Sequence, residues 1–120
     1  MSHTITVKDL KMPDLDILTA ACDRLGLGAP RHGTHSVYSA KHTGHAVNLP
    51  EWRYPVVVDD GGTIRYDNYN GSWGSQNELD KLKQAYGVEA GHKIARDQRL
   101  RVVAEEVLTD GSVKLQCREI

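Results

Sequence analysis

Both tryptophans and three of the five tyrosines lie within one stretch of the chain, Trp52–Trp73, and the protein has no phenylalanine. Aromatic rings beside amide side chains are suited to stacking on a flat ligand or packing against a protein partner. The sequence therefore predicts a ligand- or partner-binding surface built from two flanks of this stretch. The candidate residues are Trp52, Arg53 and Tyr54 on the first flank and Asp67, Asn68, Tyr69, Asn70 and Trp73 on the second.

The second flank leads into a predicted helix start at Ser75, where free backbone amides attract anions. We therefore expect either a protein partner or a small anionic ligand. Arg53 has the chemistry to stack on an aromatic ring or to clamp a carboxylate. In the alternative interpretation, Trp73 and Tyr69 fold inward to close the end of a sheet, because Trp and Tyr are usually largely buried in small domains. Asn68 and Asn70 would then cap turns.

Four of the six histidines form two His-x-x-His pairs, His32 with His35 and His42 with His45. Imidazole nitrogen is a ligand for zinc, nickel and copper. Residues three apart on a strand face opposite ways, so each pair would need a turn or loop, which its internal glycine permits. Because the spacing matches none of the usual ligand patterns, the alternative is a flexible, solvated polar loop. No metal or other cofactor is expected.

Three carboxylates, Asp59, Asp60 and Asp67, lie close together in sequence and could bind magnesium or perform acid–base chemistry. Turn formation by Asp60 with Gly61 and loop capping by Asp67 account for them equally well. The chain carries no nucleophile motif and no phosphate-binding glycine loop, so no catalytic residue is assigned. A second hypothesis is nevertheless a small metal-dependent hydrolase, using one or more of His35, His42 and His45 with Asp59 or Asp67.

Periodicity and turn residues predict the elements that would position these groups. Leu15, Leu18, Cys22 and Leu25 predict a buried helical stripe that starts near Pro13 and stops at Gly26. Ser75 and Glu78 form a capping box at the start of a long helix that should end near Asp97–Arg99. Strands are predicted at His3–Lys8, Val37–Tyr38, Val47–Leu49, Tyr54–Asp59 and Thr63–Tyr66, the last two joined by Asp60-Gly61-Gly62.

The chain ends in a predicted hairpin around Asp110-Gly111, a type I′ turn signal. A two-residue loop would place Leu108 opposite Val113, Ala104 opposite Cys117, and Glu106 opposite Leu115. One carboxylate then falls on an apolar face, which predicts a β-bulge or an exposed sheet end. The alternative is a partly buried glutamate with a functional partner.

Together these elements predict one α+β domain over residues 1–120, with a mainly antiparallel sheet. Two helices would pack on one face, a short one near the N-terminus and a long one before the C-terminal hairpin. At 120 residues the chain is long enough to form a single core without metal or disulfide support. A third functional hypothesis is a homo-oligomeric structural protein that assembles by pairing of an exposed final strand, Val113–Ile120.

The bulk composition narrows the setting in which the protein acts. A formal net charge of −1 gives no sequence-wide case for binding nucleic acid. No apolar run approaches a membrane span, and the first residues lack the apolar core of a secretion signal. Cys22 and Cys117 fall on predicted core faces, so we expect buried thiols rather than a disulfide, and a cytoplasmic location.

An ordered series of short motifs resembles a known family. It comprises the start Met1-Ser2-His3, the block Tyr66-Asp-Asn-Tyr-Asn-Gly-Ser-Trp-Gly74, then Leu79, Gln84-Ala-Tyr86, Val88-Glu89 and Asp110-Gly-Ser-Val-Lys-Leu115. The series resembles the uncharacterised domain-of-unknown-function family 1257 of bacteria, phages and, as a hypothetical reading frame, algal plastids. The likeness spans nearly the whole length, is weakest at Leu27–His45, and implies a full-length domain in a bacterial or phage cytoplasm. It implies no activity.

Overall fold

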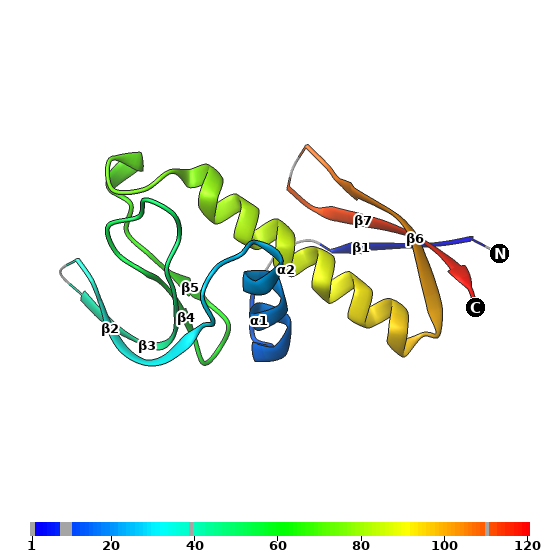
Figure 1. Ribbon diagram of the computed structural model, residues 1–120, viewed down its shortest axis with the longest axis horizontal. Coiled ribbons are helices and arrows are strands. Elements are labelled where there is room, and N and C mark those ends of the chain that lie inside the picture. Colours follow the sequence, from blue (N-terminus) through cyan, green and yellow to red (C-terminus); the bar gives the residue numbers. More distant parts are fainter. Residues whose placement is uncertain (1, 8–10, 39, 110) are drawn as a thin grey trace.

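The computed structural model describes residues 2–7, 11–38, 40–109 and 111–120. Within these residues it holds two helices and seven strands in two antiparallel sheets, which confirms the α+β class (Figure 1). One sheet has the order β1-β7-β6 and the other β2-β3-β4-β5. The strands are β1 Ser2–Val7, β2 Arg31–Val37, β3 Ala40–Val47, β4 Val56–Asp59, β5 Ile64–Arg65, β6 Leu100–Val107 and β7 Val113–Glu119. The helices are α1 Leu15–Arg24 and α2 Gln76–Asp97, with a single 3-10 turn, η1, at Tyr69–Gly71.

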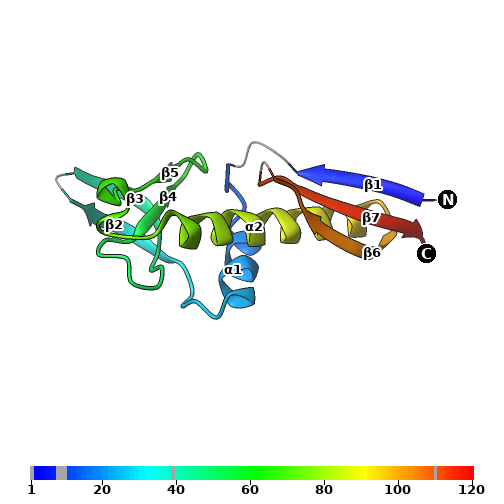
Figure 2. The same cartoon turned by 90° about the horizontal axis from the view of Figure 1, so that it is seen from above.

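Helix α2 runs lengthwise between the two sheets and gives the molecule its elongated form of 52 × 27 × 23 Å (Figure 2). Leu79, Leu82 and Tyr86 in its first half pack with α1 and with β3 and β4. Val88 and Ala95 in its second half pack against the three-stranded sheet. One helix therefore serves two apolar clusters, and the long helix predicted from the sequence is confirmed. No helix in the described part of the chain is long and apolar enough to cross a membrane.

Helix α1 begins and ends where the sequence predicts. The Asp14 carboxylate accepts hydrogen bonds from the amides of Asp16 and Ile17, and Gly26 takes the left-handed conformation just after the helix at φ 71°. Leu18 and Cys22 are buried as expected. The prediction for Leu15 is wrong, because its side chain is 44% exposed, and Ala21 takes a place in the core instead.

Helix α2 begins at Ser75 as predicted, but the capping box does not form. The Ser75 side chain makes no capping hydrogen bond. Glu78 bonds Lys81, one turn ahead, at 3.1 Å instead of reaching back. The carbonyl oxygen of Ser75 accepts a hydrogen bond from Trp52 Nε1 at 3.0 Å, so this helix end is fixed by tertiary contact.

The segment read as a solvated loop is a regular β-hairpin. Strands β2 and β3 pair from Arg31 with Ala46 to Val37 with Ala40, so the predicted short strands at Val37–Tyr38 and Val47–Leu49 are wrong in extent. The strands alternate small polar residues and histidines instead of apolar ones, which hides the period-2 pattern. Gly44 lies so close to the backbone of Val58 that a Cβ atom there would overlap its carbonyl oxygen.

The C-terminal hairpin has a different register from the predicted one. Val107 pairs with Val113, Ala104 with Gln116 and Glu105 with Leu115. A bulge between Val102 and Ala104 shifts the register, so a bulge is confirmed although the predicted pairs are wrong. Asp110 lies outside the described residues.

Two further predictions are decided by strand order and burial. β7 lies between β1 and β6, so the final strand is not a free edge, and the predicted route to homo-oligomers through it is wrong. Cys22 and Cys117 are free and buried, as expected. Burial raises the pKa of the Cys22 thiol to about 11, which keeps it protonated and unreactive at neutral pH.

Candidate functional site

Four aromatic side chains and one arginine gather at the outer end of the four-stranded sheet. We call this set the aromatic surface: Tyr38, Arg53, Tyr54, Tyr69 and Trp73. Trp73 lies at its centre, with ring centroids 4.8 Å from Tyr69, 4.8 Å from Tyr38 and 5.5 Å from Tyr54. The Tyr69 ring is stacked on Trp73 at an interplanar angle of 23°. The structure thus brings residues from both predicted flanks into one patch.

The outer rings of the aromatic surface are exposed and their backbones are strained. Tyr38 is 57% exposed and Tyr69 62%, so the predicted alternative in which Tyr69 folds inward is wrong. Both residues have positive φ angles, 56° and 46°, and Asn70 follows at 51°. A left-handed backbone costs a non-glycine residue about 1–2 kcal/mol. Exposed rings return little of that energy by burial, so the fold alone gives no reason for tyrosine here.

Arg53 supplies the positive charge of the aromatic surface. Its guanidinium carbon lies 5.3 Å from the centroid of the Trp73 ring and 5.8 Å from that of Tyr54, within cation–π range. No carboxylate among the described residues forms an ion pair with Arg53. The rings hold the guanidinium in place and leave its charge available to an incoming anion.

The loop that presents Tyr69 and Trp73 is held by its own polar groups. The Asp67 carboxylate accepts a hydrogen bond from the Tyr69 amide at 2.9 Å. The Asn68 carbonyl accepts from the amides of Gly71 at 3.0 Å and Trp73 at 2.9 Å. Asp67 and Asn68 therefore act as supports of the loop, as the capping interpretation predicted, while Asn70 is exposed at its tip.

Trp52 faces the other way, into the core. It packs against the apolar cluster of α1, α2, β3 and β4, and its only ring contact among the described residues is Tyr66, at 5.9 Å. Its ring covers Gly74, where any Cβ atom would overlap it, and its Nε1 bonds the Ser75 carbonyl. We call Trp52, Tyr66, Gly74 and Ser75 the inner anchor. The Arg53 amide donates to the Trp73 carbonyl at 2.8 Å and joins the inner anchor to the aromatic surface.

Comparison with known proteins found no matching family model, no matching curated protein and no matching solved structure.

The four histidines of the hairpin lie on opposite faces in cross-strand pairs. His32 is opposite His45, with ring centroids 4.8 Å apart, and His35 is opposite His42. The expectation that each His-x-x-His pair needs a turn is therefore wrong, because it is the cross-strand partners that share a face. His35 Nε2 lies 3.0 Å from the carbonyl oxygen of Arg31. The described residues contain no group of three or more His, Cys, Asp or Glu side chains placed to hold a metal ion.

Asp59 and Asp60 belong to the turn between β4 and β5. Asp59 accepts hydrogen bonds from the amides of Thr63 and Gly61 and from Arg65. The Thr63 amide, followed by Arg65, holds the pKa of Asp59 below its usual value. Asp60 is exposed and lies 3.5 Å from His32 Nε2. The predicted turn thus occupies the Asp59 carboxylate, and the hydrolase hypothesis loses one of its two acids.

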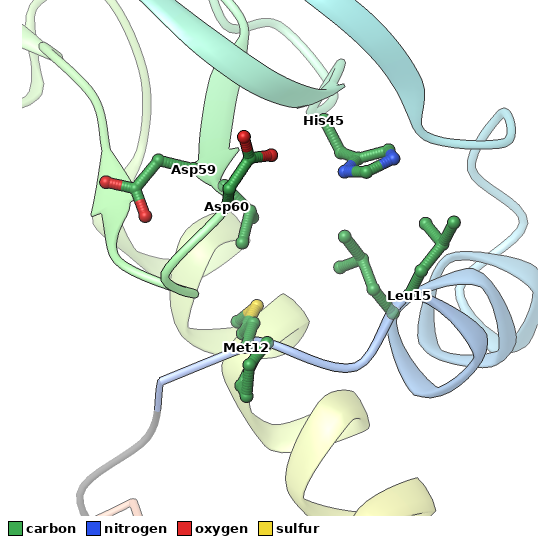
Figure 3. A pocket seen from close by; sticks show the side chains of 8 residues that line it. Met12, Leu15, His45, Asp59 and Asp60 are labelled. Atoms are coloured by element: carbon green, nitrogen blue, oxygen red, sulfur yellow. The ribbon is translucent and has the colours of Figure 1, made fainter.

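A small pocket opens between α1 and the four-stranded sheet (Figure 3). His45 and Leu15 point toward one another across it, whereas the Asp59 carboxylate points away. Its volume of about 170 Å³ is below the range of about 300–1,000 Å³ found for ligand pockets. We assign it no ligand. It is lined by Met12, Pro13, Leu15, Leu18, His45, Val58, Asp59 and Asp60.

Tyr38 is the one member of the aromatic surface that the sequence analysis missed. It directly follows β2 at a two-residue turn, and the sequence analysis placed it inside a short strand. An aromatic residue between Val37 and Ser39 gives no turn signal by itself. The hairpin becomes visible only when His32–Val37 and Ala40–His45 are recognised as a mirrored pair of polar strands.

Proposed function

We propose that this protein is a non-enzymatic binding protein that engages a protein partner through the aromatic surface. The observation that carries the proposal is the state of Tyr38 and Tyr69, which are exposed aromatic rings on strained backbones. Strained residues persist where the surrounding structure enforces them, and they cluster at functional sites. Tyr, Trp and Arg are also the residues that most often dominate the energy of protein interfaces.

The electrostatics of the aromatic surface favour a partner that presents a carboxylate. Arg53 is held over two rings, and no described carboxylate neutralises it. An acidic side chain of the partner would meet a guanidinium that is already positioned, so less side-chain entropy is lost on binding. A small anionic ligand satisfies the same charge but would leave Tyr38 and Tyr69 largely uncovered.

The test is affinity capture from cell lysate with the wild-type protein, a Tyr69→Ala variant and a Trp73→Ala variant as bait. A hot-spot residue contributes about 2 kcal/mol or more, so each variant should recover at least tenfold less of any specific partner. Val107→Ala is the matched control, because Val107 is also exposed but lies on β6 in the other sheet. Recovery unchanged from wild type in both aromatic variants, with both folded, would refute the proposal.

The setting of the protein is part of the proposal. We propose membership of the uncharacterised family that the motif series resembles and a cytoplasmic role in a bacterium or phage. Two buried free cysteines support a reducing compartment, because an oxidising one favours disulfides.

A further inference from the structure

Strand β2 is an edge strand whose outer side pairs with no strand among the described residues. It is seven residues long and contains no proline and no acidic residue. Edge strands are usually protected by shortness, bulges, proline or charge. The other edge of the same sheet, β5, is only two residues long, and edge strand β6 carries a bulge and two glutamates. Edge β2 has none of these protections apart from Arg31 at its start.

The direction of the outer peptide groups follows from the bonds within the sheet. The Asp59 amide bonds the Thr63 carbonyl, so the peptide groups of Asp59 face β5. Peptide directions alternate along a strand, so those of Val58 face β3 and meet His45. By the same alternation, the peptide groups of Gly44 face β2 and meet Gly33.

The peptide groups of β2 between those bonded pairs must therefore face outward. They belong to His32, Thr34 and Ser36, three donors and three acceptors spaced for one added strand. Tyr38 of the aromatic surface directly follows this edge. An extended segment bound along β2 would thus continue onto the aromatic surface.

The charge around this edge selects the chemistry of the bound segment. Between Arg24 and Glu51 the sequence contains no acidic residue, while Arg31, Lys41 and four histidines lie on β2 and β3. The whole chain has a net charge of −1, so this hairpin is a locally basic part of a nearly neutral protein. Complementary charge steers an acidic partner to it and disfavours a basic one.

We infer that the partner adds an extended, acidic peptide segment as a strand along the free edge of β2, with one end on the aromatic surface. This inference rests on the proposed function, because it specifies the chemistry of the partner for that site. Main-chain hydrogen bonds supply affinity in this mode of recognition, and side chains at alternate positions supply specificity. A single-stranded nucleic acid would use the basic charge and the rings but not the outward amides of β2.

The experiment selects displayed random peptides, each longer than the seven residues of β2, on the immobilised wild-type protein. Thr34→Pro removes one outward amide at a position where an edge strand tolerates proline. Thr34→Val is its matched control, because it loses the same hydroxyl contact with Thr43 and keeps the amide. Selected peptides should be acidic and bind Thr34→Val like wild type. Thr34→Pro should weaken them about tenfold, the value of one or two hydrogen bonds.

Amide exchange on the wild-type protein gives a second readout that needs no folded variant. A bound peptide should slow exchange at His32, Thr34 and Ser36 more than at Gly33 and His35, which already face β3. Equal binding to Thr34→Pro, failure to enrich any acidic peptide, or preference for a single-stranded oligonucleotide would overturn the inference. If Tyr69→Ala abolishes binding and Thr34→Pro does not, the proposed function stands and this inference fails; the reverse pattern refutes the proposed function.

Discussion

Trp52 and Trp73 lie on either side of one backbone hydrogen bond, from the Arg53 amide to the Trp73 carbonyl, yet their surroundings are opposite. The Trp52 ring packs into the core, covers Gly74 and bonds the carbonyl at the start of α2. The Trp73 ring is ringed by tyrosines, two of them more than half exposed. The inner anchor holds the fold, whereas the aromatic surface is maintained by it. Changes on the two sides should therefore separate stability from binding.

The largest effect is expected at the inner anchor. Trp52→Ala should lower the free energy of unfolding by about 3 kcal/mol, because large-to-small changes of partly buried aromatic residues leave a cavity and here also free the Ser75 carbonyl. Urea unfolding followed by circular dichroism measures it. A loss below about 1 kcal/mol would mean that the inner anchor is not structural, and the comparison between the two tryptophans would fail.

A smaller loss of stability is expected at Asp14, far from the aromatic surface. Asp14→Ala removes the α1 cap and the 2.8 Å ion pair with Lys93, and should cost about 1 kcal/mol at neutral pH. Peptide binding should be unchanged, which sharpens the comparison from the other side. Loss of binding in a variant that is still fully folded at the assay temperature would show that stability and binding are not separable.

The same residue gives the pH dependence. The Lys93 hydrogen bond, followed by the Ile17 amide, holds the pKa of Asp14 below its usual value. The stabilisation by Asp14 is therefore complete above the unfolded-state pKa and is lost as pH falls through the lower folded-state pKa. Asp14→Asn keeps a capping side chain and removes the titration. The difference in unfolding free energy between Asp14→Asn and wild type should narrow as the pH is lowered through this range; a constant difference would contradict the assignment.

The smallest effect is expected at Ser75. Its hydroxyl makes no capping bond, so Ser75→Ala should change the unfolding free energy by less than about 0.5 kcal/mol, compared with about 1 kcal/mol for a working cap. Its carbonyl, which Trp52 bonds, remains in the variant. Urea unfolding of Ser75→Ala beside Asp14→Ala provides the comparison. A cost equal to that of Asp14→Ala would restore the capping box and weaken the inner anchor.

The sequence predicted what depends on local patterns. Asp14, Gly26 and the apolar spacing of α1 specify a helix without reference to the rest of the chain, and Asp60-Gly61-Gly62 specifies a turn. It failed where a distant contact decides. Trp52 replaces the Ser75 cap from 23 residues away, and a bulge near Val103 moves the register of the last hairpin. The polar hairpin of His32 and His45 lacks any apolar alternation, so no periodicity could reveal it.

For the candidate site, the sequence predicted the chemistry but not its division. Both flanks of the Trp52–Trp73 stretch were candidates, and residues from both do meet in the aromatic surface. Which rings face outward depends on the backbone crossing at Arg53 and on the left-handed conformations at Tyr38 and Tyr69. Neither feature has a signature in a single sequence, because tyrosine is an unusual residue at positive φ.

The most direct test of the central claim is the urea unfolding of Tyr69→Gly, measured together with its binding to the selected peptides. Glycine relieves the left-handed backbone and removes the stacked ring, two effects of about 1 kcal/mol that oppose one another. The account predicts an unfolding free energy within about 1 kcal/mol of wild type and at least a tenfold loss of binding. A loss of stability as large as that of Trp52→Ala, with binding retained, would show that Tyr69 serves the fold and would contradict the account.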